Sequence, residues 1–352
     1  MEKQENLFKG ELIEEKLRLY FLNSGYYVAR GVKYNFREQE ITDIDLFLYG
    51  RTSSLSRERI NVEIKNKKAP KAFERILWAK GLQGLLQFEK CVVATTDKRE
   101  LIREYGKKHN TIILDGSFLQ RLSYELGERI TEEDFLIPLS DIKSFNQYKN
   151  QNWRSIYEMS KSRLLDELDF SGFNSTLITV KYFLSKCFDA QKRLIALRAA
   201  YIILSHALII IDYIMKDIAF LELQERKEYL NNGFKYGNLG KDGVNTTIDL
   251  AVKLSNSNIS AYAVKKSLES TDVELLKEYF SKQEISKILF TLAIDFEKIA
   301  FNKTLLAPNN LDNNLKSMLA ILLDYFQINR KTFFELFENT LSPTNTEGII
   351  LT

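Results

Sequence analysis

The chain has 352 residues, of which 45% are hydrophobic, so it is long enough to bury two cores. Its two cysteines, Cys91 and Cys187, support neither a disulfide framework nor a cysteine zinc site. The net charge of +3 is nearly balanced, and the charged N-terminal residues show no signal-peptide pattern, so we expect a cytoplasmic protein.

The first predicted element is an amphipathic helix over residues 10–24. At about 100° per residue, its expected buried stripe consists of Ile13, Leu17, Tyr20, Phe21 and Ser24. Glu14 falls at the edge of this stripe beside Phe21, whereas Glu11 and Glu15 point further toward solvent.

Two predicted strands follow, at residues 41–48 and 61–68, and a polar turn joins them. Side chains two residues apart on a strand point to the same side, so Glu63 and Lys65 share one face. Pairing of the strands as a hairpin would bring Asp45 beside Glu63. The pattern therefore predicts two carboxylates and one amine near a common point.

This set of side chains suits a magnesium-dependent reaction on a phosphodiester. Mg²⁺ prefers oxygen ligands and is held in proteins by one or two carboxylates together with substrate phosphate oxygens. A lysine nearby can orient or deprotonate the attacking water and can oppose the charge that develops on the phosphate. Asp43 lies on the same strand face as Asp45 and could exchange roles with it.

The next predicted elements alternate between helix and strand, which is typical of a βαβ arrangement. They are a helix at residues 72–88, a buried strand at 91–96, a helix at 99–109 and a strand at 111–115. Lys80 and Gln87 share the apolar face of the first of these helices, as side chains aimed at an active site would. A lysine at the edge of the core gives the same pattern.

With these elements in place, residues 10 to about 120 resemble the PD-(D/E)xK nuclease superfamily. The match lies in Asp45 and in Glu63-x-Lys65, preceded by a helix that carries a glutamate. Ile44 precedes Asp45 where the family often has a proline, a departure that resembles Mrr-type and archaeal-type endonucleases. The resemblance implies a restriction-endonuclease-like α/β fold, with a mixed central sheet flanked by helices.

The resemblance also implies roles for individual residues. Glu14 is our choice for the helix glutamate, and Asp45 and Glu63 would hold Mg²⁺ with it, helped by the carbonyl oxygen of Ile64. Mn²⁺ is the expected substitute for Mg²⁺. Lys65 would act on the attacking water, and the product would be a hydrolysed phosphodiester bond.

Residues 1–125 carry about five more basic than acidic side chains, whereas the remainder is slightly acidic. This asymmetry is expected when one domain faces phosphates, which basic groups bind without reading sequence. We therefore expect a nucleic-acid partner, and the resemblance favours DNA over RNA. The candidate nucleic-acid-binding residues are Lys67, Lys68, Lys71, Arg75, Lys80 and Gln87.

We expect a nuclease-like domain at residues 1–126, a linker at 127–150 and an all-α domain at 151–352. The helices predicted in the last part are 153–168, 174–192, 194–223, 246–254, 273–280, 286–301, 311–326 and 331–341. The most apolar run, 199–211, is shorter than the roughly 20 residues of a membrane span, so we expect a central buried helix and no membrane. The helical domain would position substrate, bind a protein partner or form a homodimer.

Other chemistries find little support in the sequence. The only histidines, His109 and His206, leave few candidate bases for a histidine nuclease or a triad hydrolase. The glycine-rich segment 233–243 lacks the Gly-Lys-Ser/Thr ending of a phosphate loop and is expected to connect helices. Two alternatives to an endonuclease of restriction or anti-phage defence stay open: a catalytically silent nucleic-acid-binding or regulatory protein, and a triggered RNA-directed nuclease.

Overall fold

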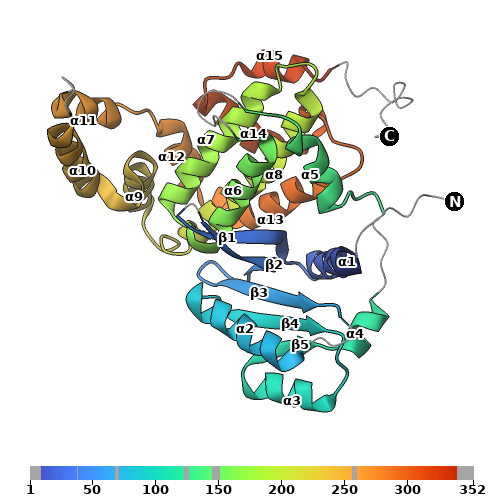
Figure 1. Cartoon of the computed structure of the whole chain (residues 1–352). Coiled ribbons are helices and arrows are strands. Elements are labelled where there is room, and N and C mark those ends of the chain that lie inside the picture. Colours follow the sequence, from blue (N-terminus) through green and yellow to red (C-terminus); the bar gives the residue numbers. More distant parts are fainter. Residues whose placement is uncertain are drawn as a thin grey trace. The chain divides into compact units, whose positions relative to one another are not determined.

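The structure, a computed structural model, describes residues 9–37, 39–67, 71–122, 127–144, 151–255 and 260–338. The chain divides into two compact units, with the boundary between Asp166 and Glu167. The first unit contains a mixed five-stranded sheet with flanking helices, and the second unit is mostly helical (Figure 1). This division confirms the expected coarse architecture, an α/β part followed by a helical part.

The sheet has the strand order β1-β2-β3-β4-β5, which is also the order along the chain. The strands are β1 (Tyr27–Phe36), β2 (Gln39–Arg51), β3 (Arg57–Lys65), β4 (Lys90–Thr95) and β5 (Thr111–Leu114). β1, β2 and β3 are antiparallel neighbours, whereas β3, β4 and β5 run parallel. Parallel strands need crossover connections, and α2 (Ala72–Leu85) and α3 (Glu100–Lys108) supply them.

The two faces of the sheet carry separate cores because successive side chains on a strand alternate between the faces. On one face, α1 (Lys9–Asn23) packs through Leu17 against a cluster that includes Leu46. On the other face, Ile76 of α2 and Ile102 of α3 belong to a second cluster with β4 residues. Charged side chains that project from the ends of the same strands therefore have a rigid support.

Two details of α1 differ from the sequence-based expectation. Tyr20 and Ser24 are exposed rather than buried, and Ser24 lies beyond the last helical residue. Glu15, expected toward solvent, is fully buried. Its burial has a physical cause, because Arg30 from β1 supplies an opposite charge 3.0 Å from the Glu15 carboxylate.

β1 was not among the predicted elements, and two further helices pack in the same unit. They are α5 (Glu132–Ser140) and α6 (Trp153–Asp166). α5 begins with a capping box in which Thr131 and Asp134 exchange side-chain and backbone hydrogen bonds. The compact first unit therefore includes most of the segment expected as a linker, and its boundary falls after α6.

α8 (Arg193–Met215) forms the centre of the second unit and packs against α7 (Phe170–Lys186) and α13 (Gln283–Ala300). By length and composition alone, α8 is the one helix in the described ranges that could span a membrane. Of its most apolar window, 83% is buried inside the protein, as the expected central helix requires. His206 is also buried there.

The remaining helices are mostly short and differ from the predicted set in their boundaries. They are α4 (Gly116–Arg121), α9 (Leu223–Tyr236), η2 (Gly237–Leu239), α10 (Gly240–Leu254), α11 (Ala261–Glu269), α12 (Glu274–Phe280), η3 (Pro308–Asn310), α14 (Asn313–Tyr325) and α15 (Arg330–Glu335). The segment 233–243, expected as a connection, is largely helical. The breaks fall at Gly237 and Gly240, whose positive φ angles of 58° and 63° suit glycine.

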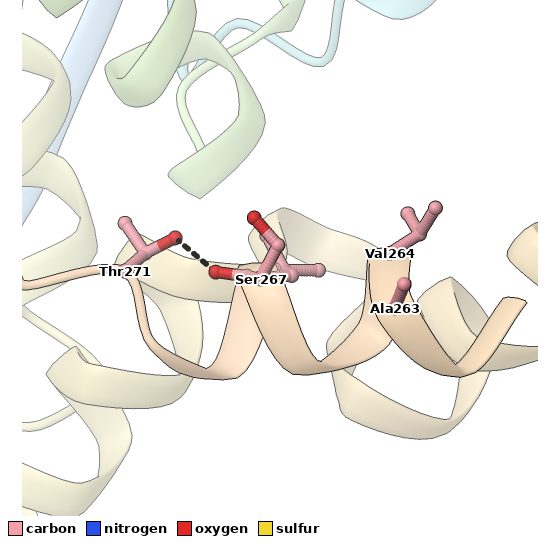
Figure 2. A pocket seen from close by; sticks show the side chains of 5 residues that line it. Ala263, Val264, Ser267 and Thr271 are labelled. Carbon is pink, nitrogen blue, oxygen red and sulfur yellow. Dashed lines mark hydrogen bonds between the residues drawn. The ribbon is translucent and has the colours of Figure 1, made fainter. Parts of the chain in front are cut away.

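A shallow hollow on α11 is lined by Ala263, Val264, Ser267, Leu268 and Thr271 (Figure 2). The Thr271 hydroxyl donates a hydrogen bond to the Ser267 carbonyl oxygen at 3.4 Å. All five lining side chains are uncharged, so the hollow offers no ionic group to a charged ligand.

Candidate functional site

Asp45 and Glu63 lie where the β2–β3 ladder opens. The paired residues end at Leu46 and Val62, and Asp45 and Glu63 come next on their strands. The Asp45 Oδ2 atom accepts a hydrogen bond from the Ile64 backbone N–H at 2.6 Å. The Asp45 carboxylate therefore binds the backbone at the end of β3, and this hydrogen bond fixes Asp45 next to Glu63.

The surroundings of Asp45 and Glu63, here called the acid pair, disfavour negative charge. Burial raises the pKa of Asp45 to about 8, with a further contribution from the negative charge of Glu63, although the Ile64 N–H opposes this shift. Burial also raises the pKa of Glu63, while the positive charges of Arg75 and Lys65 oppose it. Two partly desolvated carboxylates at one point would be stabilised by an added cation.

Glu14 contributes to this site from α1 but is held by another group. The Arg30 Nε atom donates a hydrogen bond to the Glu14 Oε2 atom at 2.8 Å. Burial raises the pKa of Glu14 and Arg30 opposes the shift, while the charge of Glu14 in turn raises the pKa of Asp45. Within the described part of the chain, no three Asp, Glu, His or Cys side chains are grouped closely enough to hold a metal ion.

Two cations from different elements face Glu63. Lys65 is half-buried two residues further along β3, and its charge opposes the rise in the pKa of Glu63 that burial causes. Arg75 reaches Glu63 from α2, with 3.2 Å between Arg75 Nη1 and Glu63 Oε1. Arg75, expected as a phosphate contact, is thus an ion-pair partner of the acid pair.

Lys67 and Lys71 both follow Glu63 in the chain, between β3 and α2. Lys67 is exposed just after β3, and its carbonyl oxygen accepts a hydrogen bond from the Thr96 hydroxyl at 2.6 Å. Lys71 precedes α2 and pairs with Glu74 at 3.2 Å, with 69% of its side chain exposed. Lys68, the third candidate in this stretch, lies outside the described residues.

Lys80 and Gln87 are not brought to the acid pair. α2 ends at Leu85, so Gln87 is not on the helix as expected. The Gln87 carbonyl oxygen accepts a hydrogen bond from Arg59 at 2.5 Å. Arg59 lies opposite Tyr49 in the β2–β3 ladder, away from the Asp45 end of these strands. The Lys80 ammonium donates to the Gln83 side-chain oxygen at 2.6 Å.

Sequence reasoning missed a buried ion cluster that joins α1, β1, α5 and α6. We define it as Glu14, Glu15, Arg18, Arg30, Glu132, Glu133 and Lys161. Arg30 Nη1 lies 2.6 Å from a Glu133 oxygen in addition to its contacts with Glu14 and Glu15. Arg30 therefore links Glu14, whose charge contributes to the raised pKa of Asp45, to α5.

Lys161 and Glu132 occupy the interior of the same cluster. Lys161 Nζ donates hydrogen bonds to the Arg30 carbonyl oxygen at 2.6 Å and to the Glu132 carboxylate at 2.8 Å. Arg18 Nη1 reaches the other Glu132 oxygen at 2.9 Å. Burial alone would raise the pKa of Glu132, but Lys161, Arg18 and Tyr157 outweigh it and lower that pKa. An arginine within the otherwise apolar start of β1 was the one available sequence signal.

Comparison with protein-family models, curated proteins and solved structures found no match to this chain. A functional proposal therefore depends on the motif and on the geometry of the site.

Proposed function

We propose that the first unit is a metal-dependent endonuclease domain of the PD-(D/E)xK type. The hydrogen bond between Asp45 and the Ile64 N–H carries this proposal, because it seats Asp45 beside Glu63 with Lys65 on the same strand face. The antiparallel β1–β3 meander, followed by a crossover helix and the parallel strand β4, supports it further. A mixed central sheet flanked by helices is what the resemblance implies.

The side chains present fit a magnesium or manganese ion. Asp45 and Glu63 offer carboxylate oxygens, and two carboxylates with water are a common Mg²⁺ ligand set. On the same proposal the Ile64 carbonyl would add an oxygen, and Glu14 would join the site only by leaving its ion pair with Arg30. When bound, the ion supplies polarisation of a phosphoryl oxygen and of a water molecule.

The two cations at Glu63 would act on the substrate. The Lys65 ammonium would orient the attacking water and oppose the negative charge that develops on the phosphate. Arg75, held at the Glu63 carboxylate, would place a second positive charge beside the same phosphate. The expected outcome is cleavage of a P–O bond by water.

The wider role is proposed by analogy with the company that such domains keep. We propose DNA rather than RNA as substrate, a cytoplasmic location, and a part in restriction or anti-phage defence. The helical second unit would bind a protein partner or a second copy.

Two observations favour a second candidate, a catalytically silent nucleic-acid-binding protein. Glu63 already has an ion-pair partner in Arg75, and no close group of three potential ligands is found among the described side chains. In this case the basic residues would bind phosphates, and the acid pair would be structural.

Substitution of two lysines separates these candidates. Lys65→Ala should abolish cleavage while leaving nucleic-acid affinity nearly unchanged, because the loss falls on the transition state. The control Lys67→Ala should keep cleavage at saturating substrate and reduce the salt slope of binding by about 0.7 to 0.9 for one lost phosphate contact. Gel cleavage of single- and double-stranded DNA and RNA with Mg²⁺ or Mn²⁺, beside salt-dependent binding, measures both effects. Wild-type protein that binds these substrates but cleaves none would favour the silent candidate.

A further inference from the structure

We propose that a cleft in the first unit, separate from the acid pair, binds phosphate groups of a nucleic-acid backbone. The cleft lies between α2, α3 and the starts of β4 and β5, with a volume of about 740 Å³. Four cations from three elements line it: Lys80, Lys90, Arg103 and Lys107. α2 and α3, which contact each other, flank it on one face of the sheet.

The charges around this cleft leave two lysines for a ligand. Its one acidic lining residue, Glu89, is engaged by Arg59, whose backbone N–H donates to the Glu89 carboxylate at 2.6 Å. Lys90 and Arg103 are paired with Glu58 and Asp115, at 2.5 and 3.1 Å. In the described part of the chain, neither Lys80 nor Lys107 forms an ion pair with an acid.

Lys80 is held in place by a neutral side chain rather than by a charge. The Gln83 side-chain oxygen accepts from Lys80 at 2.6 Å, while the Gln83 amide nitrogen donates to the Glu89 carbonyl oxygen at 3.2 Å. This chain of bonds orients the Lys80 ammonium without neutralising it. An oriented cation of this kind is suited to a phosphate oxygen, because it loses little side-chain freedom on binding.

The opposite wall comes from the turn between α3 and β5. Asn110 has a φ of 50° there, a left-handed conformation that asparagine tolerates, and it carries the chain from the helix into the strand. Asn110 and Lys107 thus line the cleft from one short segment. Amide and ammonium groups are typical phosphate contacts.

Position along the strands favours a polymer over a single nucleotide. Lys90 lies opposite Ile60 in the β3–β4 ladder, and Ile60 is three residues before Glu63 on β3. The cleft therefore begins roughly 10 Å from the acid pair along the strands. A chain with one phosphate at the acid pair can place other phosphates at this distance, whereas a mononucleotide cannot. This choice of polymer rests on the proposed function, but the phosphate site itself does not.

The test measures binding in EDTA, where no metal-dependent cleavage occurs. Affinities for a labelled single-stranded DNA oligonucleotide and for pyrophosphate are compared between the wild type and the double variant Lys80→Ala, Lys107→Ala. Lys108→Ala is the matched control, because Lys108 is exposed next to Lys107 on α3 and does not line the cleft. The double variant should bind DNA more weakly, with a salt slope lower by about 1.4 for two lost contacts. Lys80→Arg with Lys107→Arg should retain most of the affinity.

The two ligands distinguish the sources of phosphate. Loss of DNA affinity in the double variant but not in Lys108→Ala supports a backbone site. Loss of pyrophosphate affinity with unchanged DNA affinity overturns the backbone assignment in favour of free phosphates. If the double variant matches Lys108→Ala with both ligands, the cleft is not a phosphate site. Failure of the nuclease proposal would show in the cleavage assay and would leave this binding result unaffected.

Discussion

Asp45 is subject to two opposing effects on its charge. The Ile64 N–H, 2.6 Å from the Asp45 Oδ2 atom, stabilises the carboxylate, but burial and the nearby charge of Glu63 destabilise it more. The pKa of about 8 is therefore well above the ordinary value of 3.8. A group with this environment is a candidate for function, because a bound cation would stabilise its charged form.

Replacing Asp45 by asparagine should stabilise the metal-free protein increasingly as the pH rises from about 4 to about 8. The folded-state pKa lies above the unfolded one, so the folded state holds its proton more tightly and wild-type stability falls across this window. The asparagine has no charge to bury and its oxygen can still accept the Ile64 N–H. Each unit of pKa difference corresponds to about 1.4 kcal/mol, so the gain near pH 8 should be a few kcal/mol.

Urea unfolding in EDTA at several pH values measures this gain. Asp43→Asn is the control, because Asp43 is exposed two residues away on the same strand. A gain of equal size in both variants, or a gain that does not grow with pH, would refute the buried-charge explanation.

At the scale of elements, the buried ion cluster attaches α5 and α6 to α1 and β1. Lys161 of α6 has only 3% of its side chain exposed, and it bonds both the backbone of β1 and the Glu132 carboxylate of α5. The Tyr157 hydroxyl also donates to Glu132 at 2.7 Å, and burial raises the pKa of Tyr157. Because the charges are desolvated together, the cluster depends on all of its members.

Lys161→Met should therefore lower the free energy of unfolding by about 3 to 5 kcal/mol, since it leaves Glu132 buried with less compensation. Arg154→Met is the control on the same helix. The Arg154–Glu158 pair is 2.8 Å apart but Arg154 is 46% exposed, so its loss should cost about 1 kcal/mol or less. Denaturant unfolding at neutral pH compares the two. Equal losses in the free energy of unfolding would mean that the buried ion cluster stabilises the protein no more than an exposed ion pair does.

At the scale of the whole molecule, the division after Asp166 defines which segments complete the first unit. A chain ending at Asp166 keeps α5, α6 and every member of the buried ion cluster. A chain ending at residue 126 removes Glu132, Glu133 and Lys161, and so leaves Arg18 and Arg30 with fewer acids.

We expect the chain that ends at Asp166 to unfold in a single cooperative transition and the chain that ends at residue 126 to be unfolded or aggregated. Exposure of buried arginines and of the apolar surface under α5 and α6 explains the difference. Circular dichroism melts and size-exclusion chromatography of both chains provide the measurement. A well-folded shorter chain would restore the boundary expected from sequence.

The sequence by itself determined the features that depend on local spacing. The two-residue period of a strand puts Glu63 and Lys65 on one face, and the apolar composition of 199–211 indicates a buried helix. The order of helices and strands between residues 72 and 114 also follows from such patterns. These properties arise between neighbours in the chain, so one sequence suffices to predict them.

Only the tertiary structure decided which charged groups are buried and what they contact. Glu15 has the helical position of a solvent residue, yet it is buried because Arg30 comes from β1. Likewise, Arg75 meets Glu63 and Lys80 meets Gln83 because of how α2 lies on the sheet and where it ends. The energy of a buried charge depends on partners distant in sequence, and no local period encodes those partners.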